Sequence, residues 1–241
     1  MKPPLRVACV GGWGSTAEIW ASLARALPEA ELEVVPWWQC LGSGAGPLGS
    51  LLAAREPPAL LVGWSLGAIA LLGAVLAEGR AGVAPAVCLL SGSARMASEE
   101  GYPGADPRAL RAMRMRLSGD PRAVLADFAA LCAVPDAGAT DFAARYVEQA
   151  AAVPEGSLGD GLLFLAQRDL RGRLGPRAVS VLWIHGECDA VIPVESARYA
   201  AARAPGVRLE VLSGRGHALP WTAAPDVARR IRGLLHGRRS D

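Results

Sequence analysis

The stretch that decides the fold is Ala59-Leu60-Leu61-Val62-Gly63-Trp64-Ser65-Leu66-Gly67, which an Ala/Leu-rich run to Glu78 follows. A short apolar run that stops at a turn is typical of a buried strand, and the run after it has helical length. Glycines stand two residues before and two residues after Ser65, where side chains would clash across a sharp turn. The stretch predicts a strand, a strained turn and a helix, with Ser65 at the helix N-terminus; a chance glycine-rich turn is the alternative.

Similar apolar runs occur on both sides of this turn, and segments of helical length separate most of them. The expected strands are Leu5–Val10, Leu32–Val35, Ala59–Trp64, Ala86–Leu90, Val179–Ile184 and Val207–Leu212. The expected helices between and after them are Ala17–Leu27, Gly49–Arg55, Leu66–Glu78, Val194–Ala204 and Ala223–Leu235. Strands that alternate with helices are typical of a parallel sheet covered on both faces. We therefore predict an α/β fold with a mostly parallel sheet of about six strands.

The alternation stops between Ser93 and about Pro176. This segment has almost no β-branched runs, but it has helix starts such as Asp106-Pro107 and Asp120-Pro121. The expected helices are Pro107–Leu117, Pro121–Cys132, Asp141–Ala152 and Leu158–Leu170. We expect residues 1–94 and 177–241 to form the core, with residues 95–176 inserted as a helical cap, or lid.

Composition excludes several classes of protein. The 241 residues are 51% hydrophobic and 20% charged, which fits a folded domain rather than a disordered chain. The net charge of +2 provides no broad basic field, so we expect no nucleic-acid partner. No apolar stretch reaches the length of a membrane span, and no apolar signal core precedes the first strand, so we expect no membrane association.

The five cysteines are odd in number and include no CxxC pair. No histidine is spaced from them in the pattern of a metal site. We therefore expect a reduced, cytoplasmic setting, no metal and no organic cofactor.

A serine hydroxyl is a weak nucleophile unless a base takes its proton and an acid orients the base. His217 lies in a glycine-rich loop directly after the last strand, and it is the predicted base. His185 ends a strand and is expected to be a packed structural residue, whereas His236 lies in an arginine-rich tail and is expected at the surface.

The acid should follow a strand between the serine and the histidine. Asp189 follows the run that ends at Ile184 and is the predicted acid, with Glu187 as the alternative. The order serine, aspartate, histidine along the chain is that of α/β-hydrolases, so we predict the α/β-hydrolase fold.

Two backbone N–H groups are needed to bind the oxyanion that forms when the serine attacks. Leu66 follows the serine, and Trp13 lies in the loop after the first strand, so these residues are the predicted donors. The indoles of Trp13 and Trp64 are also candidates to line the acyl site, with core packing as the alternative.

Several motifs together resemble one family, the pimeloyl-[acyl-carrier protein] methyl ester esterases of biotin synthesis. They are Gly63-Trp64-Ser65-Leu66-Gly67, Gly12-Trp13-Gly14 with Ala17-Glu18-Ile19-Trp20, the stretch from Tyr102-Pro103-Gly104 through Leu117-Ser118-Gly119-Asp120 to Phe128-Ala129-Ala130-Leu131, and Gly161-Leu162-Leu163 through Asp169-Leu170-Arg171. The resemblance implies a serine carboxylesterase that hydrolyses the methyl ester of a carrier-bound pimeloyl chain. The positions that match family residues lining the acyl site are Trp13, Ser65, Leu66, Phe128, Leu131 and His217, and Cys132 stands where the family usually has glutamine.

The chain departs from this family where carrier binding is concerned. Ala123 and Asp127 occupy two positions that are arginines in the family. Other arginines, Arg108, Arg111 and Arg114, fall along one flank of a predicted helix and are candidates to bind an acidic acyl-carrier protein; ordinary solvated arginines are the alternative. Two other functions stay open: a general short-chain carboxylesterase or thioesterase, and a hydrolase-like protein that binds a ligand without turnover.

Overall fold

The structure is a computed structural model that describes residues 4–42, 46–78, 85–175 and 180–237. Six strands form a single sheet in the order β2-β1-β3-β4-β5-β6, and every neighbouring pair is parallel. The strands are β1 Leu5–Val10, β2 Ala30–Val35, β3 Leu60–Trp64, β4 Ala86–Leu90, β5 Val181–Gly186 and β6 Val207–Leu212. This confirms the predicted sheet; the expected strand start at Val179 lies outside the described residues.

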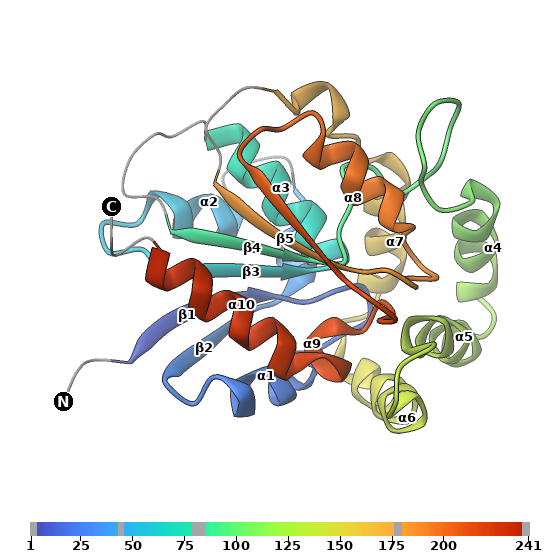
Figure 1. The fold of residues 1–241 in the computed structure, drawn as a ribbon. Helices are drawn as coiled ribbons and strands as arrows, with labels where there is room; N and C mark the ends of the chain where they lie inside the picture. The colour runs from blue at the N-terminus through green and yellow to red at the C-terminus, as the bar shows by residue number, and fades with distance from the viewer. Residues whose placement is uncertain (1–3, 43–45, 79–84, 176–179, 238–241) are drawn as a thin grey trace.

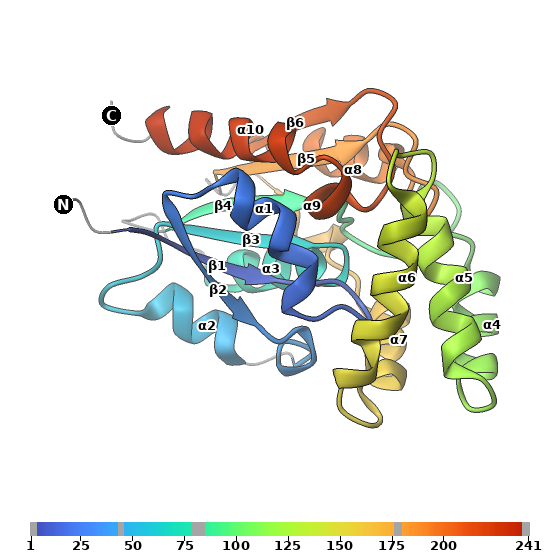
Figure 2. The same ribbon diagram turned by 90° about the horizontal axis from the view of Figure 1, so that it is seen from below.

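Burial follows the position of each strand in the sheet. Every residue of β3, β4 and β5 is buried, as expected for strands with helices on both sides, whereas the edge strands β2 and β6 carry partly exposed residues. Helices α1 (Ala21–Ala26) and α10 (Ala224–Gly237) pack on one face, and α2 (Gly46–Ala53) and α3 (Leu66–Glu78) pack on the other (Figures 1 and 2). A further helix, α8 (Val194–Ala201), packs against β5 and β6.

The strand order reverses direction beside β1. The chain runs from β1 outward to β2, and then crosses to β3 on the other side of β1. In such sheets ligands bind beyond the carboxyl ends of the strands, next to this switch point. The fold therefore places a site where β1 and β3 end.

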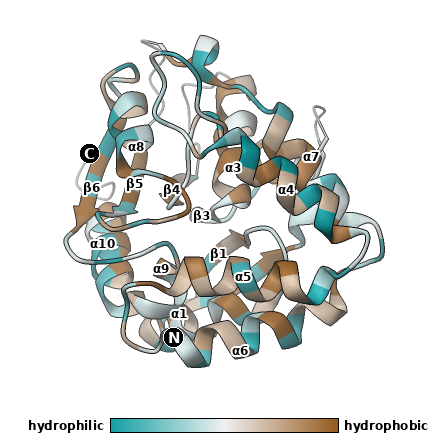
Figure 3. Cartoon of the chain, turned by 90° about the vertical axis from the view of Figure 1, so that its right-hand side faces the viewer, coloured by the Kyte–Doolittle hydropathy of each residue, from teal (hydrophilic) through white to brown (hydrophobic). Residues whose placement is uncertain are grey.

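Four longer helices lie between β4 and β5 in the chain, and we call them the helical insertion. They are α4 Pro107–Leu117, α5 Pro121–Ala133, α6 Ala139–Gln149 and α7 Ser157–Gln167. Asp106 and Asp120 cap α4 and α5, each accepting a hydrogen bond from a backbone N–H of the first turn, and a proline follows each cap. The helical insertion covers the carboxyl edge of the sheet (Figures 1 and 2), and hydrophilic residues lie along α4 (Figure 3).

Some predicted boundaries were wrong. The last helix of the insertion ends at Gln167 instead of Leu170, because Asp169 forms a β-bridge with Arg95 of the segment after β4. The short helix α9 (Leu219–Thr222) was not predicted. None of the helices in the described ranges is both long and apolar enough to cross a bilayer.

Candidate active site

Ser65 lies in the tight turn between β3 and α3, at the carboxyl edge of the sheet. Its backbone has φ 55°, a left-handed conformation that is costly for a residue with a side chain. The backbone segments around this turn lie so close together that two positions leave no room for a side chain. A Cβ on Gly67 would lie 2.2 Å from the carbonyl oxygen of Val10, and a Cβ on Gly63 would lie 2.7 Å from the carbonyl oxygen of Gly67. The glycines are therefore a steric requirement, and the turn aims the Ser65 hydroxyl away from the sheet.

The structure brings His217 and Asp189 to this hydroxyl. The Nε2 atom of His217 lies 2.9 Å from Ser65 Oγ, and its Nδ1 lies 2.7 Å from Asp189 Oδ2. His217 is fully buried, and Ser65 and Asp189 are 4% and 7% exposed. The imidazole can therefore accept the serine proton on one nitrogen while the carboxylate holds the proton on the other.

Asp189 is fixed by backbone and side-chain donors. Its Oδ1 accepts hydrogen bonds from the N–H groups of Val191 and Ile192, at 2.9 and 2.8 Å. Burial opposes ionisation of this carboxyl, but attraction to His217 and hydrogen bonds from His185 and His217 outweigh burial and hold the pKa of Asp189 below its ordinary value. Asp189 is therefore a carboxylate at neutral pH.

His185 is buried, as predicted, and it also contacts Asp189. Its Nε2 lies 2.9 Å from the carbonyl oxygen of Ile192 and 3.2 Å from Asp189 Oδ2. Its Nδ1 is buried without a partner among the described residues, so its polar contacts in the described ranges are made through Nε2. Sequence reasoning missed the contact because it depends on the path of the loop between the two residues.

The alternative acid and the third histidine lie elsewhere. The Glu187 carboxylate accepts hydrogen bonds from Ser213 Oγ and the Gly214 N–H, at 2.6 and 3.1 Å, and these lower its pKa. His236 lies on the exposed end of α10, where its Nδ1 is 2.6 Å from the carbonyl oxygen of Arg232. The structure therefore brings neither residue to Ser65.

The two predicted oxyanion donors lie on different elements; a Cβ on Gly12, the neighbour of Trp13, would lie 3.0 Å from the Cβ of Ser65. Leu66 is the first residue of α3, and Trp13 lies in the loop after β1. Within the described ranges, neither backbone N–H has a hydrogen-bond acceptor. The helical insertion fixes Trp13 at two points: the Tyr146 hydroxyl donates to the Trp13 carbonyl oxygen, and the indole Nε1 of Trp13 donates to the Leu158 carbonyl oxygen at 2.7 Å.

Aromatic side chains from core and insertion enclose His217. The Trp13 and Phe128 rings meet edge to face at 5.2 Å, and Phe128 lies 6.4 Å from the His217 ring. Trp64 is fully buried and donates its indole N–H to the His217 carbonyl oxygen at 2.9 Å, so it supports the histidine from the core side.

The other two predicted substrate contacts, both on α5, differ in burial. Cys132 is fully buried; burial raises the pKa of its thiol, and its carbonyl oxygen accepts the Ala218 N–H. Leu131 is 44% exposed.

Asp136, in the segment after α5, is a site residue that sequence reasoning missed. Its side chain is fully buried, and its Oδ2 accepts hydrogen bonds from the Gly216 N–H at 3.1 Å and from Thr222 Oγ1 at 2.7 Å. Asp136 therefore holds the turn just before His217. No sequence signal links residues so far apart in the chain.

Metal binding has no obvious place in the described part of the chain, which contains no group of three or more His, Cys, Asp or Glu side chains arranged around a common point.

The parallel sheet and the serine turn at its carboxyl edge define the class of this protein: it is an α/β-hydrolase. Solved structures with this fold include an esterase from Exiguobacterium antarcticum, with a TM-score of 0.82 and 18% identity over 98% of this chain and 93% of that one. A bromoperoxidase from Bacillus anthracis has a TM-score of 0.80 and 21% identity over 97% of this chain and 92% of that one. No protein-family model matches the chain.

Curated relatives identify the family more narrowly. The chain is 30% identical to a pimeloyl-[acyl-carrier protein] methyl ester esterase from Xanthomonas campestris pv. campestris (strain B100), over 91% of this chain and 90% of the relative. Proteins of the same name from Serratia marcescens and Stenotrophomonas maltophilia (strain K279a) are 28% and 31% identical, over 89% and 75% of this chain and 87% and 70% of theirs. The chain belongs to the pimeloyl-[acyl-carrier protein] methyl ester esterase family, and it is a carboxylic ester hydrolase.

Proposed function

We propose that this esterase hydrolyses the methyl ester of pimeloyl-[acyl-carrier protein] in biotin synthesis. The observation that carries the proposal is the hydrogen-bonded line from Ser65 through His217 to Asp189, in a chain whose curated relatives bear that name. The roles of these residues follow from their chemistry.

Ser65 is the nucleophile. His217 accepts the hydroxyl proton on Nε2 as Ser65 Oγ bonds to the ester carbonyl carbon, and the charge that develops on the carbonyl oxygen is held by the N–H groups of Trp13 and Leu66. His217 then returns the proton to the departing methoxide, which leaves as methanol. Water, activated by His217, hydrolyses the acyl-serine and releases a free carboxylate. Asp189 stabilises the imidazolium in both steps.

Residues 95–176 act as the cap in this proposal. Phe128 and Trp13 form the apolar wall against which the acyl chain lies, with Trp64, Leu131 and Cys132 as further contacts. The deep burial of Ser65 favours a substrate with a slender ester end, such as a methyl ester, because a bulky alcohol would have to displace the wall.

The carrier docks, in this proposal, on the exposed arginines of α4. Arg108, Arg111 and Arg114 are exposed, and no ion pair involves them within the described ranges. Arg116, on the same helix, is paired with Asp127 at 2.8 Å. The three arginines therefore present charge that an acidic protein could neutralise.

Turnover of the carrier-linked methyl ester, a small methyl ester and p-nitrophenyl acetate by the purified protein tests the function. We expect the carrier-linked ester to have the highest kcat/KM, and the gene to restore growth of a biotin auxotroph that lacks its esterase. Equal or higher kcat/KM for short esters or thioesters would favour the general carboxylesterase or thioesterase. Failure to form an acyl-enzyme with any activated ester would favour a binding protein.

The docking surface has its own test. Reversing Arg111 and Arg114 to Glu should raise KM for the carrier-linked ester about 10-fold and weaken its salt dependence, because rim charges act mainly on association. The small ester should be unaffected. Arg198→Glu on α8 is the matched control, since Arg198 is exposed and lies on a helix that is not part of the helical insertion. Equal losses on both substrates, or none on either, would exclude this surface.

A further inference from the structure

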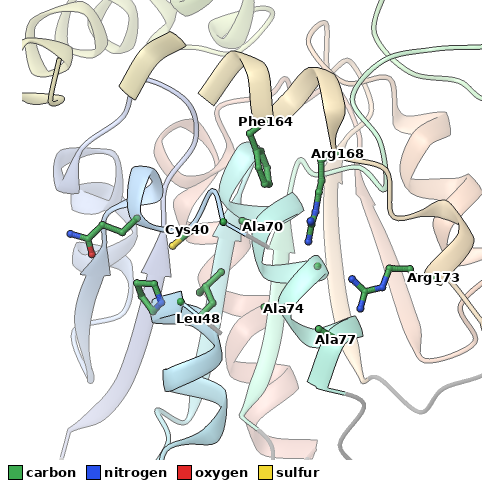
Figure 4. Close-up of a pocket in the computed structure, with 13 residues that line it drawn as sticks. Cys40, Leu48, Ala70, Ala74, Ala77, Phe164, Arg168 and Arg173 are labelled. Carbon is green, nitrogen blue, oxygen red and sulfur yellow. The ribbon is translucent and has the colours of Figure 1, made fainter. Parts of the chain in front are cut away.

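A cavity lies beside α3, apart from the candidate active site. It has a volume of about 140 Å³ and is bounded by α3, the first turn of α2, and the segment from the end of α7 to Arg173 (Figure 4). Neither Ser65, His217 nor Asp189 lines it. The walls are mainly small or apolar, including Leu48, Ala70 and Ala74, and two arginines, Arg168 and Arg173, extend into it (Figure 4).

Arg168 is held against α3. A Cβ at Gly73 would lie 2.4 Å from Nη2 of Arg168 and 3.4 Å from its Nε, so the missing side chain makes the space that the guanidinium occupies. The charged group lies 5.7 Å from the centre of the Phe164 ring. Its Nε is buried and has no hydrogen-bond acceptor among the described residues. A donor in that position costs free energy unless an acceptor enters the cavity.

The positive charge of this cavity is not balanced by the residues described around it. Burial and the nearby charge of Arg173 lower the pKa of Arg168, because both make the charged form of its guanidinium less favourable. The described lining includes no Asp or Glu, and no ion pair there involves either arginine. By contrast Arg171, between them in the chain, pairs with Glu99 and with Asp169. Asp160 lines the hollow on the other side of Arg168 but forms no ion pair with it.

We propose that this cavity binds a phosphate group, as a free dianion or as part of a phosphomonoester. The two guanidinium groups carry two positive charges, which a phosphate dianion balances in full and a single carboxylate balances only by half. Their N–H groups also donate well to phosphate oxygens. The first turn of α2, with Gly46 and Pro47 at the cavity, adds the positive end of a helix dipole. The volume accommodates a phosphate with a few further atoms, since a water molecule takes about 30 Å³ in the liquid.

Calorimetric titration of the whole protein at low ionic strength tests this site. Inorganic phosphate should bind saturably to the wild type, and acetate should not. Arg173→Gln, which removes an exposed side chain, should weaken phosphate binding about 10-fold or more, the loss expected when one charge-assisted partner is removed. Arg198→Gln, an exposed arginine on α8, should bind phosphate as the wild type does. Turnover of a small ester should be the same in all three proteins.

A second variant, Gly73→Ala, tests whether weaker phosphate binding could result from loss of folding instead of loss of the site. Alanine favours a helix interior more than glycine does, so this variant should unfold at the same temperature as the wild type or higher. It should still lose phosphate affinity about 10-fold, because the added methyl displaces the Arg168 guanidinium.

Glycerol phosphate distinguishes the two ligand sources, and glycerol is the control without a phosphate group. Tighter binding of glycerol phosphate than of inorganic phosphate indicates a phosphomonoester, and the reverse indicates the free ion. Non-saturable binding to the wild type would overturn the proposal, and so would wild-type phosphate affinity in both Arg173→Gln and Gly73→Ala.

Discussion

The core and the helical insertion contribute to the same site in different ways. The core supplies Ser65, Asp189 and His217 from the turns after β3, β5 and β6, where backbone geometry leaves each side chain little freedom. The insertion supplies none of these three groups, but its residues hold two loops that border them: Tyr146 bonds to Trp13 in the loop after β1, and Asp136 bonds to Gly216, the residue before His217. The three hydrogen-bonded side chains and the residues that hold the neighbouring loops thus come from separate parts of the chain, and mutations in the two parts should have distinguishable effects.

Loss of the nucleophile should have the largest effect. Ser65→Ala should lower ester turnover about 10⁴-fold or more, because only oxyanion binding and substrate positioning would remain. Steady-state hydrolysis of a small methyl ester measures this, and unchanged thermal unfolding serves as the control. Activity within tenfold of the wild type would mean that the core does not supply the nucleophile.

The two acidic candidates after β5 should differ sharply. Asp189→Asn should reduce turnover by about 10³- to 10⁴-fold, because an amide favours the wrong tautomer of His217. Glu187→Gln should change it by less than about threefold, since the Glu187 carboxylate accepts its hydrogen bonds from Ser213 and Gly214 rather than from His217. The opposite ranking would assign the role of the acid to Glu187.

Asp136, in the insertion, should affect kcat and not KM when it is replaced. This result would distinguish a positioning residue of the insertion from the reacting groups proposed for the core. Asp136→Ala should lower kcat for a small ester by about 10-fold with little change in KM, because the buried Gly216 N–H loses its acceptor and the His217 turn loosens. Asp136→Asn keeps an oxygen acceptor and should retain most of the activity. Asp127→Ala, on the exposed side of α5, is the matched control. If KM rises while kcat is unchanged, Asp136 contributes to substrate binding rather than to positioning.

Asp169 lies where the insertion returns to the core and bonds to Arg95 and Arg171. Its replacement should have the smallest effect, a loss of stability that depends on pH. Hydrogen bonds from Arg171, together with those from Arg95, hold the pKa of Asp169 below its ordinary value despite partial burial. The carboxylate therefore stabilises the fold above its unfolded-state pKa of about 4, and this contribution disappears as pH falls further through the folded-state value.

Asp169→Asn should accordingly lower the free energy of unfolding at pH 7 by about 0.5–1 kcal/mol, a value limited by the partial exposure of the ion pairs. Urea titrations at pH 7 and pH 2 measure it, because the contribution is lost mainly as pH approaches the folded-state pKa. A difference between the variant and the wild type that is equally large at both pH values would indicate that ionisation of Asp169 is not its cause.

The sequence predicted the core better than the insertion for a physical reason. Strand β3 and the turn at Ser65 are local: the apolar run and the flanking glycines suffice to predict them. Asp189 and His217 could be chosen because each follows a strand in a fixed chain order. The hydrogen bonds of Asp136 and Tyr146 join segments 80 and 133 residues apart, and neither side chain differs in its local pattern from an ordinary helix or loop residue.

The bond between Asp136 and Gly216 ties the α4–α7 segment of this chain to the loop that carries His217. Replacing the α4–α7 segment as a whole would also replace the acceptor that holds the turn before His217. A chimaera that imports a new specificity must therefore import a matching acceptor, or restore one by a second change near Gly216. Recombination within the α4–α7 segment should be tolerated best where the break leaves Asp136 with its own His217 loop.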